Sequence, residues 1–119
     1  MAHPAEEQEW MDNRVESWVE TYKKSMLTPV ILRVVDDRQP VTVAGIASEI
    51  AARTGWAITE RSLYRTLKRL QDSGLLHGAE IDAPRTGAKL KELSLTALGT
   101  QFLAGVTANL VDISGEDKA

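Results

Sequence analysis

The residues with the clearest potential for chemistry are four cations that recur at helical spacing between positions 59 and 70. If this segment is a helix, Leu63, Leu67 and Leu70 lie on one side at the i, i+4, i+7 spacing of a buried stripe. The other side then carries Arg61, Arg65, Lys68 and Arg69, with Tyr64 at its margin. Guanidinium and ammonium groups bind anions through charge-assisted hydrogen bonds. The segment therefore predicts a surface that binds a polyanion.

The charge of the chain is distributed unevenly along the sequence. The net charge of −3 over 119 residues gives by itself no reason to expect a nucleic-acid partner. Residues 1–20 contain six acids and one arginine, giving −5, whereas residues 59–91 contain seven cations and four acids, giving +3. Residues 92–119 contain four acids and one lysine, giving −3. A basic middle between acidic ends indicates a surface for nucleic acid, and the alternative is an ordinary solvated helix.

The composition excludes several other classes of protein. The chain has no cysteine, so it has neither disulfides nor thiolate metal ligands, which is typical of the cytoplasm. No segment approaches the roughly 20 apolar residues of a membrane span, and the acidic N-terminus lacks the apolar core of a signal peptide. His3 and His77 are isolated, and no phosphate loop or nucleophile motif occurs. We therefore expect a cytoplasmic protein that is not an enzyme and has no cofactor, metal or membrane partner.

The first elements expected along the chain are two helices. A helix over residues 6–24 carries an apolar stripe whose spacing alternates between four and three, which is the seam of a helix that packs on another helix. The stripe consists of Met11, Val15, Trp18 and Tyr22, with Trp10 beside it. A second helix is predicted over residues 27–37, because Pro29 is best accommodated in a first helical turn. Residues 1–5 are predicted to be disordered.

A pair of helices follows, separated by a short connector. Thr42 is expected to cap a helix that reaches about residue 53 and ends at Gly55. Residues 54–58 form the connector, and Thr59 is expected to cap the basic helix. This connector is longer than the tight turn of a minimal helix-turn-helix.

The last third of the chain is predicted to form a hairpin and a final helix. Apolar and polar residues alternate over residues 75–81 and 90–95, as in half-buried strands. Thr96 is expected to cap a helix that runs to about residue 111. Its inward-facing residues are expected to be Leu98, Phe102, Val106 and Leu110. The fold class is therefore α+β and mostly α: a winged helix-turn-helix with a two-stranded hairpin wing, flanked by an N-terminal and a C-terminal helix.

A family resemblance is carried by residues 62–70 (SLYRTLKRL) and by the Gly-Leu-Leu at positions 74–76. These residues resemble the recognition-helix signature of PadR-type transcriptional regulators. Residues 87–96 keep the glycine, the two lysines and the Leu-Thr of that family's wing, and depart from it at Ala88, Leu90 and positions 92–93. The resemblance covers residues 26–110. It implies a winged-helix protein that binds double-stranded DNA and regulates transcription, as a repressor.

The resemblance assigns roles to the basic residues. The residues expected to contact DNA are Thr59, Arg61, Ser62, Tyr64, Arg65, Lys68, Arg69, Arg85, Lys89 and Lys91. Arg61 and Arg65 are expected at base edges, because arginine bonds guanine bidentately. The resemblance implies that the Tyr64 hydroxyl reaches the DNA backbone, and the alternative is an aromatic ring at the rim of the core. The two later cations of the helix and the three of the hairpin are expected to contact phosphates.

The aromatic stripe of the N-terminal helix predicts an assembly. In the resembled family the terminal helices build a homodimer and can line an effector pocket. Packing within the dimer is the first expectation for Trp10, Met11, Val15, Trp18 and Tyr22, and stacking of a small planar aromatic effector is the alternative. The expected segments are residues 1–24 for dimerisation, 25–96 for the winged-helix DNA-binding domain, and 97–119 for the C-terminal helix and a disordered tail.

Two other functions remain open from the sequence. A winged-helix adaptor would use the basic face for protein contacts, and would not need to bind duplex DNA in a salt-sensitive way. A plasmid or phage DNA-binding protein would bind DNA without an effector. Sequence-selective binding to its own promoter, relieved by a small molecule, separates a transcriptional regulator from this last class.

Overall fold

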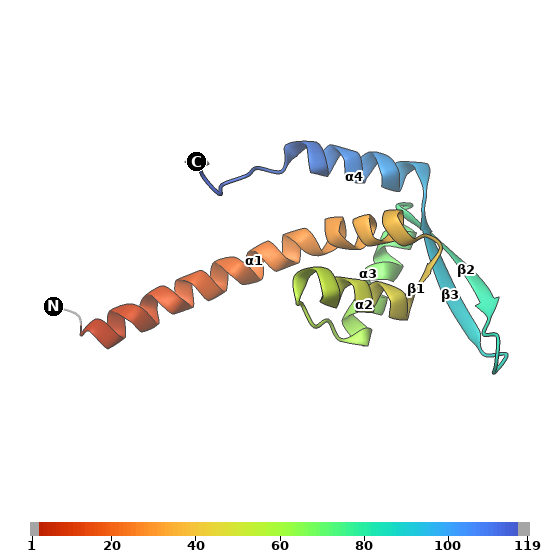
Figure 1. The fold of residues 1–119 in the computed structure, drawn as a ribbon, viewed down its shortest axis with the longest axis horizontal. Coiled ribbons are helices and arrows are strands. Elements are labelled where there is room, and N and C mark those ends of the chain that lie inside the picture. Colours follow the sequence, from red (N-terminus) through yellow and green to blue (C-terminus); the bar gives the residue numbers. More distant parts are fainter. Residues whose placement is uncertain (1–2, 117–119) are drawn as a thin grey trace.

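A computed structural model of the chain describes residues 3–116. Its elements are, in order, α1 (Pro4–Arg38), β1 (Val41–Thr42), α2 (Val43–Thr54), α3 (Glu60–Asp72), β2 (Leu76–Asp82), β3 (Lys89–Leu95) and α4 (Ala97–Asn109). In Figure 1, α1 runs along the long dimension of the molecule, and the other elements gather around its C-terminal half. The predicted α+β, mostly helical class is confirmed.

The N-terminal part of the chain is one continuous helix, where the sequence predicts two. The expected break near residues 25–26 is wrong, because α1 runs through it, and Pro29 lies inside the helix and not in a first turn. An internal proline costs about 3 kcal/mol by removing a hydrogen bond. The turns that follow it offset this cost, since Ile31, Leu32, Val34 and Val35 are all fully buried.

The start of α1 also differs from the expectation of disorder over residues 1–5. His3 caps the helix: its Nδ1 accepts a hydrogen bond from the backbone N–H of Ala5 at 3.1 Å. Pro4 occupies the first helical position, where its missing N–H costs nothing. Residues 1 and 2 of the expected disordered segment, and residues 117–119 of the expected disordered tail, lie outside the described residues.

The caps predicted from the sequence are confirmed. The hydroxyls of Thr42, Thr59 and Thr96 accept hydrogen bonds from the backbone three residues ahead, at 3.1, 3.2 and 3.0 Å. Gly55 ends α2 with φ +75, a left-handed conformation that an L side chain rarely adopts. Three of these residues, Thr42, Gly55 and Thr59, fix both ends of α2 and the start of α3, so the start of the basic helix is set locally.

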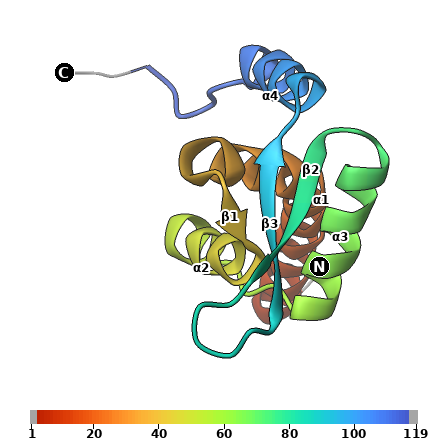
Figure 2. The same ribbon diagram turned by 90° about the vertical axis from the view of Figure 1, so that its right-hand side faces the viewer.

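The sheet has three antiparallel strands in the order β1-β3-β2, one more than the predicted hairpin. The strand missed by the sequence reading is β1, in which Val41 and Thr42 pair with Leu93 and Glu92 of β3. The hairpin pairs from Leu76↔Leu95 to Asp82↔Lys89. Figure 2 shows the sheet with β3 in the centre, α3 beside β2, and α2 beneath β1. A two-residue strand is too short to produce a readable alternation.

One core holds these elements together. It contains fourteen buried apolar residues: Ile31, Leu32, Val34, Val35, Val41, Val43, Ile46, Ile50, Leu63, Leu67, Leu70, Leu76, Leu93 and Leu103. Ion pairs tie α1 to α2 at the surface, where the Arg53 guanidinium bonds Asp37 at 2.7 Å and Glu49 at 3.0 Å. Hydrogen bonds to Asp37 and then Glu49 raise the pKa of Arg53 above its usual value. Thus the second half of α1 is a central element of the domain.

The inward face predicted for α4 is wrong. Leu103 and Gly99 are the buried residues; of the four predicted, Val106 is half-buried, whereas Leu98, Phe102 and Leu110 are exposed. The cause lies at Gly99, where a Cβ would collide with the carbonyl oxygen of Leu75. This close approach turns the glycine face of α4 toward the domain and the larger side chains outward. The helix also ends at Asn109, two residues before the expected end.

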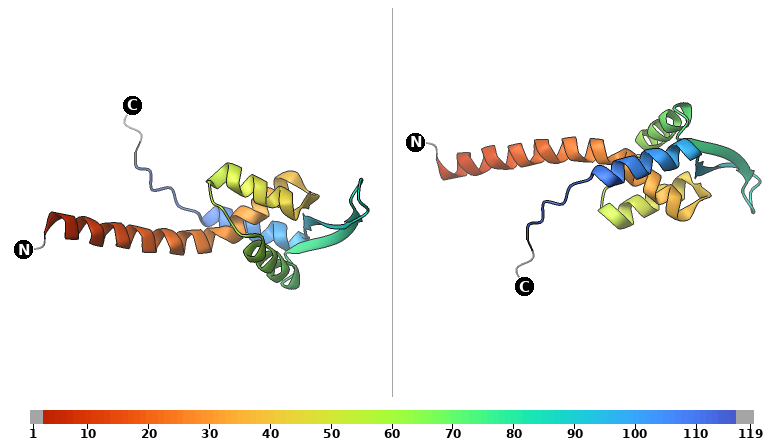
Figure 3. Two further views of the ribbon diagram at one scale, coloured as in Figure 1. Left: turned by 90° about the horizontal axis from the view of Figure 1, so that it is seen from below. Right: turned by 90° about the horizontal axis from the view of Figure 1, so that it is seen from above.

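The first half of α1 projects away from the domain. Every residue from 3 to 18 is exposed, and both views of Figure 3 show this part of the helix without a neighbouring element. We call residues 4–24 the arm; at about 1.5 Å per residue it is about 32 Å long. Within the described residues, no helix combines the length and the apolar character needed to cross a bilayer.

Candidate nucleic-acid interface

The exposed face of α3 carries the cations that the sequence places there. Arg61, Arg65, Lys68 and Arg69 are all exposed, while Leu63, Thr66, Leu67 and Leu70 are buried. The buried leucines fix the rotation of the helix, because they fill the core between α2 and the sheet. As a result the guanidinium groups point into solvent along the length of the helix. The structure therefore keeps the predicted division of α3 into an apolar side and a cationic side.

Two concave surfaces lie between α3 and the hairpin. One, of about 410 Å³, has cations from both elements in its wall, Arg65 and Lys68 from α3 and Lys91 from β3. The other, of about 460 Å³, is bounded by Tyr64, Lys89 and Lys91 together with the start of α2. Tyr64 and Lys91 line both, so they stand where the two surfaces meet. The fold thus joins Arg65 and Lys68 of the helix and two of the hairpin cations into one groove, whereas Arg61 and Arg69 are exposed on α3 outside its lining.

The remaining predicted residues lie at the ends of this groove or outside it. Arg85 lies in the exposed turn between β2 and β3. That turn is closed by Gly87, with φ +68, and by a 2.7 Å hydrogen bond from Ala83 N–H to Ala88 carbonyl. The Thr59 hydroxyl is engaged as the cap of α3, where it accepts from the Ser62 N–H. Thr59 therefore positions the helix. The exposed Ser62 hydroxyl takes no part in the cap.

Two of the predicted lysines already have acidic partners. Lys68 lies 3.2 Å from Asp72 and Lys89 lies 2.7 Å from Asp82, and all four side chains are largely exposed. Exposed pairs of this kind contribute about 0–1 kcal/mol, so a phosphate can displace the carboxylate at small cost. Within residues 3–116, Arg61, Arg65 and Lys91 form no ion pair. These three are free to meet an anion without first breaking a contact.

The structure adds residues that the sequence reading missed. Thr42, Val43 and Ala44, at the start of α2, line the groove opposite Tyr64. Gln71 lines it from the last turn of α3. Their position follows from β1, which pins the start of α2 to the sheet beside the hairpin. β1 is only two residues long and leaves no readable alternation in the sequence. The sequence therefore could not place these residues in the groove.

Two acids also line the groove. Glu60 lies in the first turn of α3, and Glu80 lies on β2. Glu80 is paired in register with Lys91 across the hairpin. A carboxylate repels the phosphate backbone, so these two positions limit how closely a polyanion can approach at that end. Within the groove, Arg65 and Lys68 therefore lie further along α3 than Glu60, which is in its first turn.

The arm presents its stripe to solvent. Trp10, Met11, Val15, Trp18 and Tyr22 are each between 44% and 64% exposed. Trp18 stacks on Tyr22 with ring centroids 5.5 Å apart, and Tyr22 meets Trp56 edge-on at 6.3 Å. The Arg14 guanidinium lies 4.8 Å above the Trp10 ring. Five large apolar side chains on one free helix form a surface that a monomer rarely exposes.

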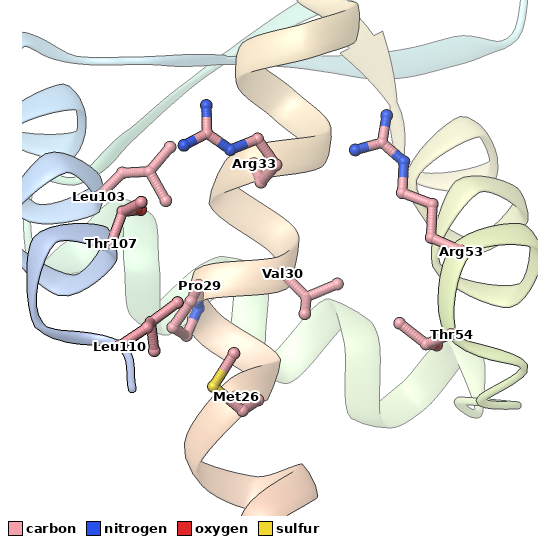
Figure 4. Close-up of a pocket in the computed structure, with 9 residues that line it drawn as sticks. All are labelled: Met26, Pro29, Val30, Arg33, Arg53, Thr54, Leu103, Thr107 and Leu110. Carbon is pink, nitrogen blue, oxygen red and sulfur yellow. The ribbon is translucent and has the colours of Figure 1, made fainter. Parts of the chain in front are cut away.

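A second apolar surface adjoins the base of the arm. A trough of about 260 Å³ runs along α1 between α2 and α4. Figure 4 shows Met26 and Pro29 on α1, Leu103 on α4 and Leu110 just after α4 in this trough, with Arg53 on the α2 side and α3 behind. The Arg33 and Arg53 guanidiniums in its wall are engaged by Asp36 and Asp37. The trough is therefore mainly apolar, and separate from the cationic groove.

Comparisons with known proteins agree on one family. The model of the family described as "Transcriptional regulator PadR-like family" matches residues 31–105. The chain is similar to the solved PadR family transcriptional regulator of Eggerthella lenta DSM 2243, with TM-score 0.67 and 26% identity over 82% of this chain and 83% of that one.

Two further solved structures are similar in fold. The PadR-like transcriptional regulator of Bacillus cereus matches with TM-score 0.65 and 22% identity, over 74% of this chain and 84% of that one. Bacillus subtilis PadR, solved in complex with operator DNA, matches with TM-score 0.65 and 22% identity, over 79% of this chain and 52% of that one. Both of these similarities concern the fold.

Proposed function

Because the chain belongs to the PadR-like family of transcriptional regulators, we propose that it binds operator DNA as a homodimer, with α3 in the major groove and the β2–β3 hairpin along the neighbouring backbone. The similarity to a family of regulators also agrees with the sequence, which carries no enzyme motif. Regulation of transcription takes place where the DNA is, so we place the protein in the cytoplasm.

The observation that carries this proposal is the cationic groove between α3 and the hairpin. An exposed α-helix fits the major groove of B-DNA, which is about 12 Å wide. Arg61 and Arg65 lie in the first half of α3, the part of a recognition helix that meets base edges. Lys89 and Lys91 of β3 line the groove together with Tyr64 of α3. They would neutralise phosphates and make affinity strongly dependent on salt.

The homodimer is supported by the exposed stripe of the arm. Operators of helix-turn-helix proteins are commonly pseudo-palindromic, so two recognition helices related by a two-fold axis read two half-sites. The arm, residues 4–24, carries the dimer contact in this proposal, and residues 25–96 contact DNA. Because Trp18 and Tyr22 already stack on each other, we favour a protein partner over a planar aromatic effector for this stripe.

A dimer seated on a promoter occupies duplex that RNA polymerase needs, so repression is the output we propose. The regulator is distinguished from a winged-helix adaptor by its DNA binding. It is distinguished from a DNA-binding protein without sequence preference by a single best site. Both distinctions can be measured with the purified protein and synthetic DNA duplexes.

The test begins with selection of a duplex from a random library, followed by fluorescence anisotropy at two salt concentrations. Arg65→Ala is expected to weaken binding to the selected duplex by about 1–3 kcal/mol and to relax preference at one base position. Lys91→Ala is expected to weaken selected and random duplex alike, and to reduce the salt slope by about one.

The matched control is Arg33→Ala, which removes the same charge from α1 outside the groove. Its affinity should remain that of the unaltered protein. Equal losses in Arg65→Ala and Arg33→Ala would mean that only net charge matters, and would contradict the placement of α3 in the DNA. Failure of the unaltered protein to enrich any duplex would contradict the function itself.

A further inference from the structure

The connector between α2 and α3 is held by few contacts, and one of them reaches the arm. Residues 55–59 have no regular secondary structure. At one end, the Trp56 N–H donates to the Thr54 hydroxyl at 3.0 Å. At the other end, Thr59 receives the N–H groups of Ser62 and Leu63, at its hydroxyl and its carbonyl respectively. The position of the first turn of α3 therefore depends on where the connector delivers Thr59.

Between these ends, Trp56 is the large side chain of the connector. It is half-buried against the core, together with Ile58. Its ring also meets Tyr22 of α1 edge-on, at 6.3 Å between centroids and 85° between planes. Edge-to-face geometry is a favoured arrangement of aromatic rings. The connector is thus braced against a residue that belongs to the arm and not to the core.

Tyr22 is in turn held by Trp18, which stacks on it at 5.5 Å with 14° between the ring planes. Trp18 is 64% exposed and Tyr22 is 44% exposed. In the free protomer, then, the brace for Trp56 consists of two rings that are largely open to water. Any partner that covers the stripe will restrict the rotamers of Tyr22 and Trp18, because both are stripe residues.

We propose that Trp56 is a positioning residue for the recognition helix α3. Tyr22 holds Trp56 in place, so a partner that covers the arm stabilises the start of α3. This inference rests on the proposed homodimer for the identity of the cover. It gives dimerisation a second effect on DNA binding, besides joining two half-sites: each recognition helix is better ordered in the dimer than in the monomer. The three-ring series Trp18, Tyr22, Trp56 is the physical connection.

The test measures hydrogen exchange at the Ser62 and Leu63 amides, both of which bond to Thr59. Tyr22→Ala is expected to speed their exchange about two- to tenfold, the effect of losing one aromatic pair. Tyr22→Phe keeps the ring and should restore the slow rate. Dilution of the unaltered protein from dimer to monomer should speed exchange at the same two amides.

Trp10→Ala is the matched control, because it removes an aromatic ring from the same stripe that has no contact with the connector. Compared with Tyr22→Ala at concentrations where both are dimers, it should leave the Ser62 and Leu63 amides unchanged. Equal exchange in the two variants, or no change in Tyr22→Ala, would overturn the inference.

Trp56→Phe gives a second reading that avoids loss of the core. It should retain slow exchange, and in this background Tyr22→Ala should again speed exchange. In a Trp56→Leu background, which removes the ring that Tyr22 meets, Tyr22→Ala should add no further acceleration; the same acceleration there as in the unaltered protein would refute the edge-on contact as the connection. The exchange readout needs no DNA, so its failure is distinguishable from a failure of the proposed DNA binding, which is tested by duplex selection.

Discussion

Replacing Trp18 with alanine should dissociate the homodimer proposed above while leaving the protomer folded. Trp18 is 64% exposed and makes no contact with the buried core in the protomer. Alanine is the best helix former, so the arm should stay helical. The loss should therefore appear in association and not in the unfolding of the domain.

The magnitude follows from the exposed area. A tryptophan buries up to about 250 Å², so its 64% exposed fraction corresponds to roughly 160 Å² available to a partner. If about half of that area is covered in the dimer, the contribution at about 25 cal/mol per Å² is about 2 kcal/mol per copy. The substitution occurs twice in a two-fold dimer, which makes about 4 kcal/mol, or about a thousandfold in the dimer Kd.

Sedimentation equilibrium over a concentration series measures this change directly. Tyr64→Ala is the matched control, since it removes an aromatic ring of similar exposure from α3. It should keep the dimer Kd and weaken DNA binding, whereas Trp18→Ala should raise the dimer Kd. An unaltered protein that is monomeric at every concentration, or a Trp18→Ala dimer as tight as the original, would refute the reasoning.

Two further predictions concern the arm and α4. Deleting residues 1–24 should give a monomer that keeps its helical circular dichroism, because all fourteen core residues lie after position 30; a truncated protein that remains dimeric would place the interface elsewhere, on α4. Gly99→Ala should lower the free energy of unfolding by about 3 kcal/mol, because the new Cβ collides with the Leu75 carbonyl. Gly105→Ala, with no neighbour within 4 Å of its Cβ, should instead raise it by about 0.5–1 kcal/mol. Urea denaturation compares the two, and equal effects would contradict the close approach at Gly99.

Much of this fold could be predicted from the sequence because its signals are local. Threonine caps at positions 42, 59 and 96 and the left-handed Gly55 act within three or four residues of themselves. The leucine spacing of α3 fixed which side is buried and therefore which side carries the arginines. For the same reason the recognition-helix signature at residues 62–70 was sufficient to indicate the family that the comparisons confirm.

What the sequence could not decide depended on contacts between distant residues. Whether Pro29 starts a helix or lies inside one is settled by the burial of the turns that follow it, which needs α2, α4 and the sheet in place. The face of α4 was predicted wrongly, because the apolar pattern does not reveal that Gly99 must lie against a carbonyl 24 positions earlier. When a helix has large apolar residues on its exposed side, its sequence pattern does not identify the buried face until the neighbouring element is known.

The groove shows the same division between sequence and tertiary structure. The sequence by itself determined that residues 59–70 would form a cationic helix, since charge and periodicity are properties of the segment alone. Only the tertiary structure decided that Tyr64 and Lys91 stand together, that the start of α2 joins them, and that Trp56 is braced by the arm. Those arrangements depend on β1 pairing with β3 and on the direction of α1, and both are set by packing across the whole domain.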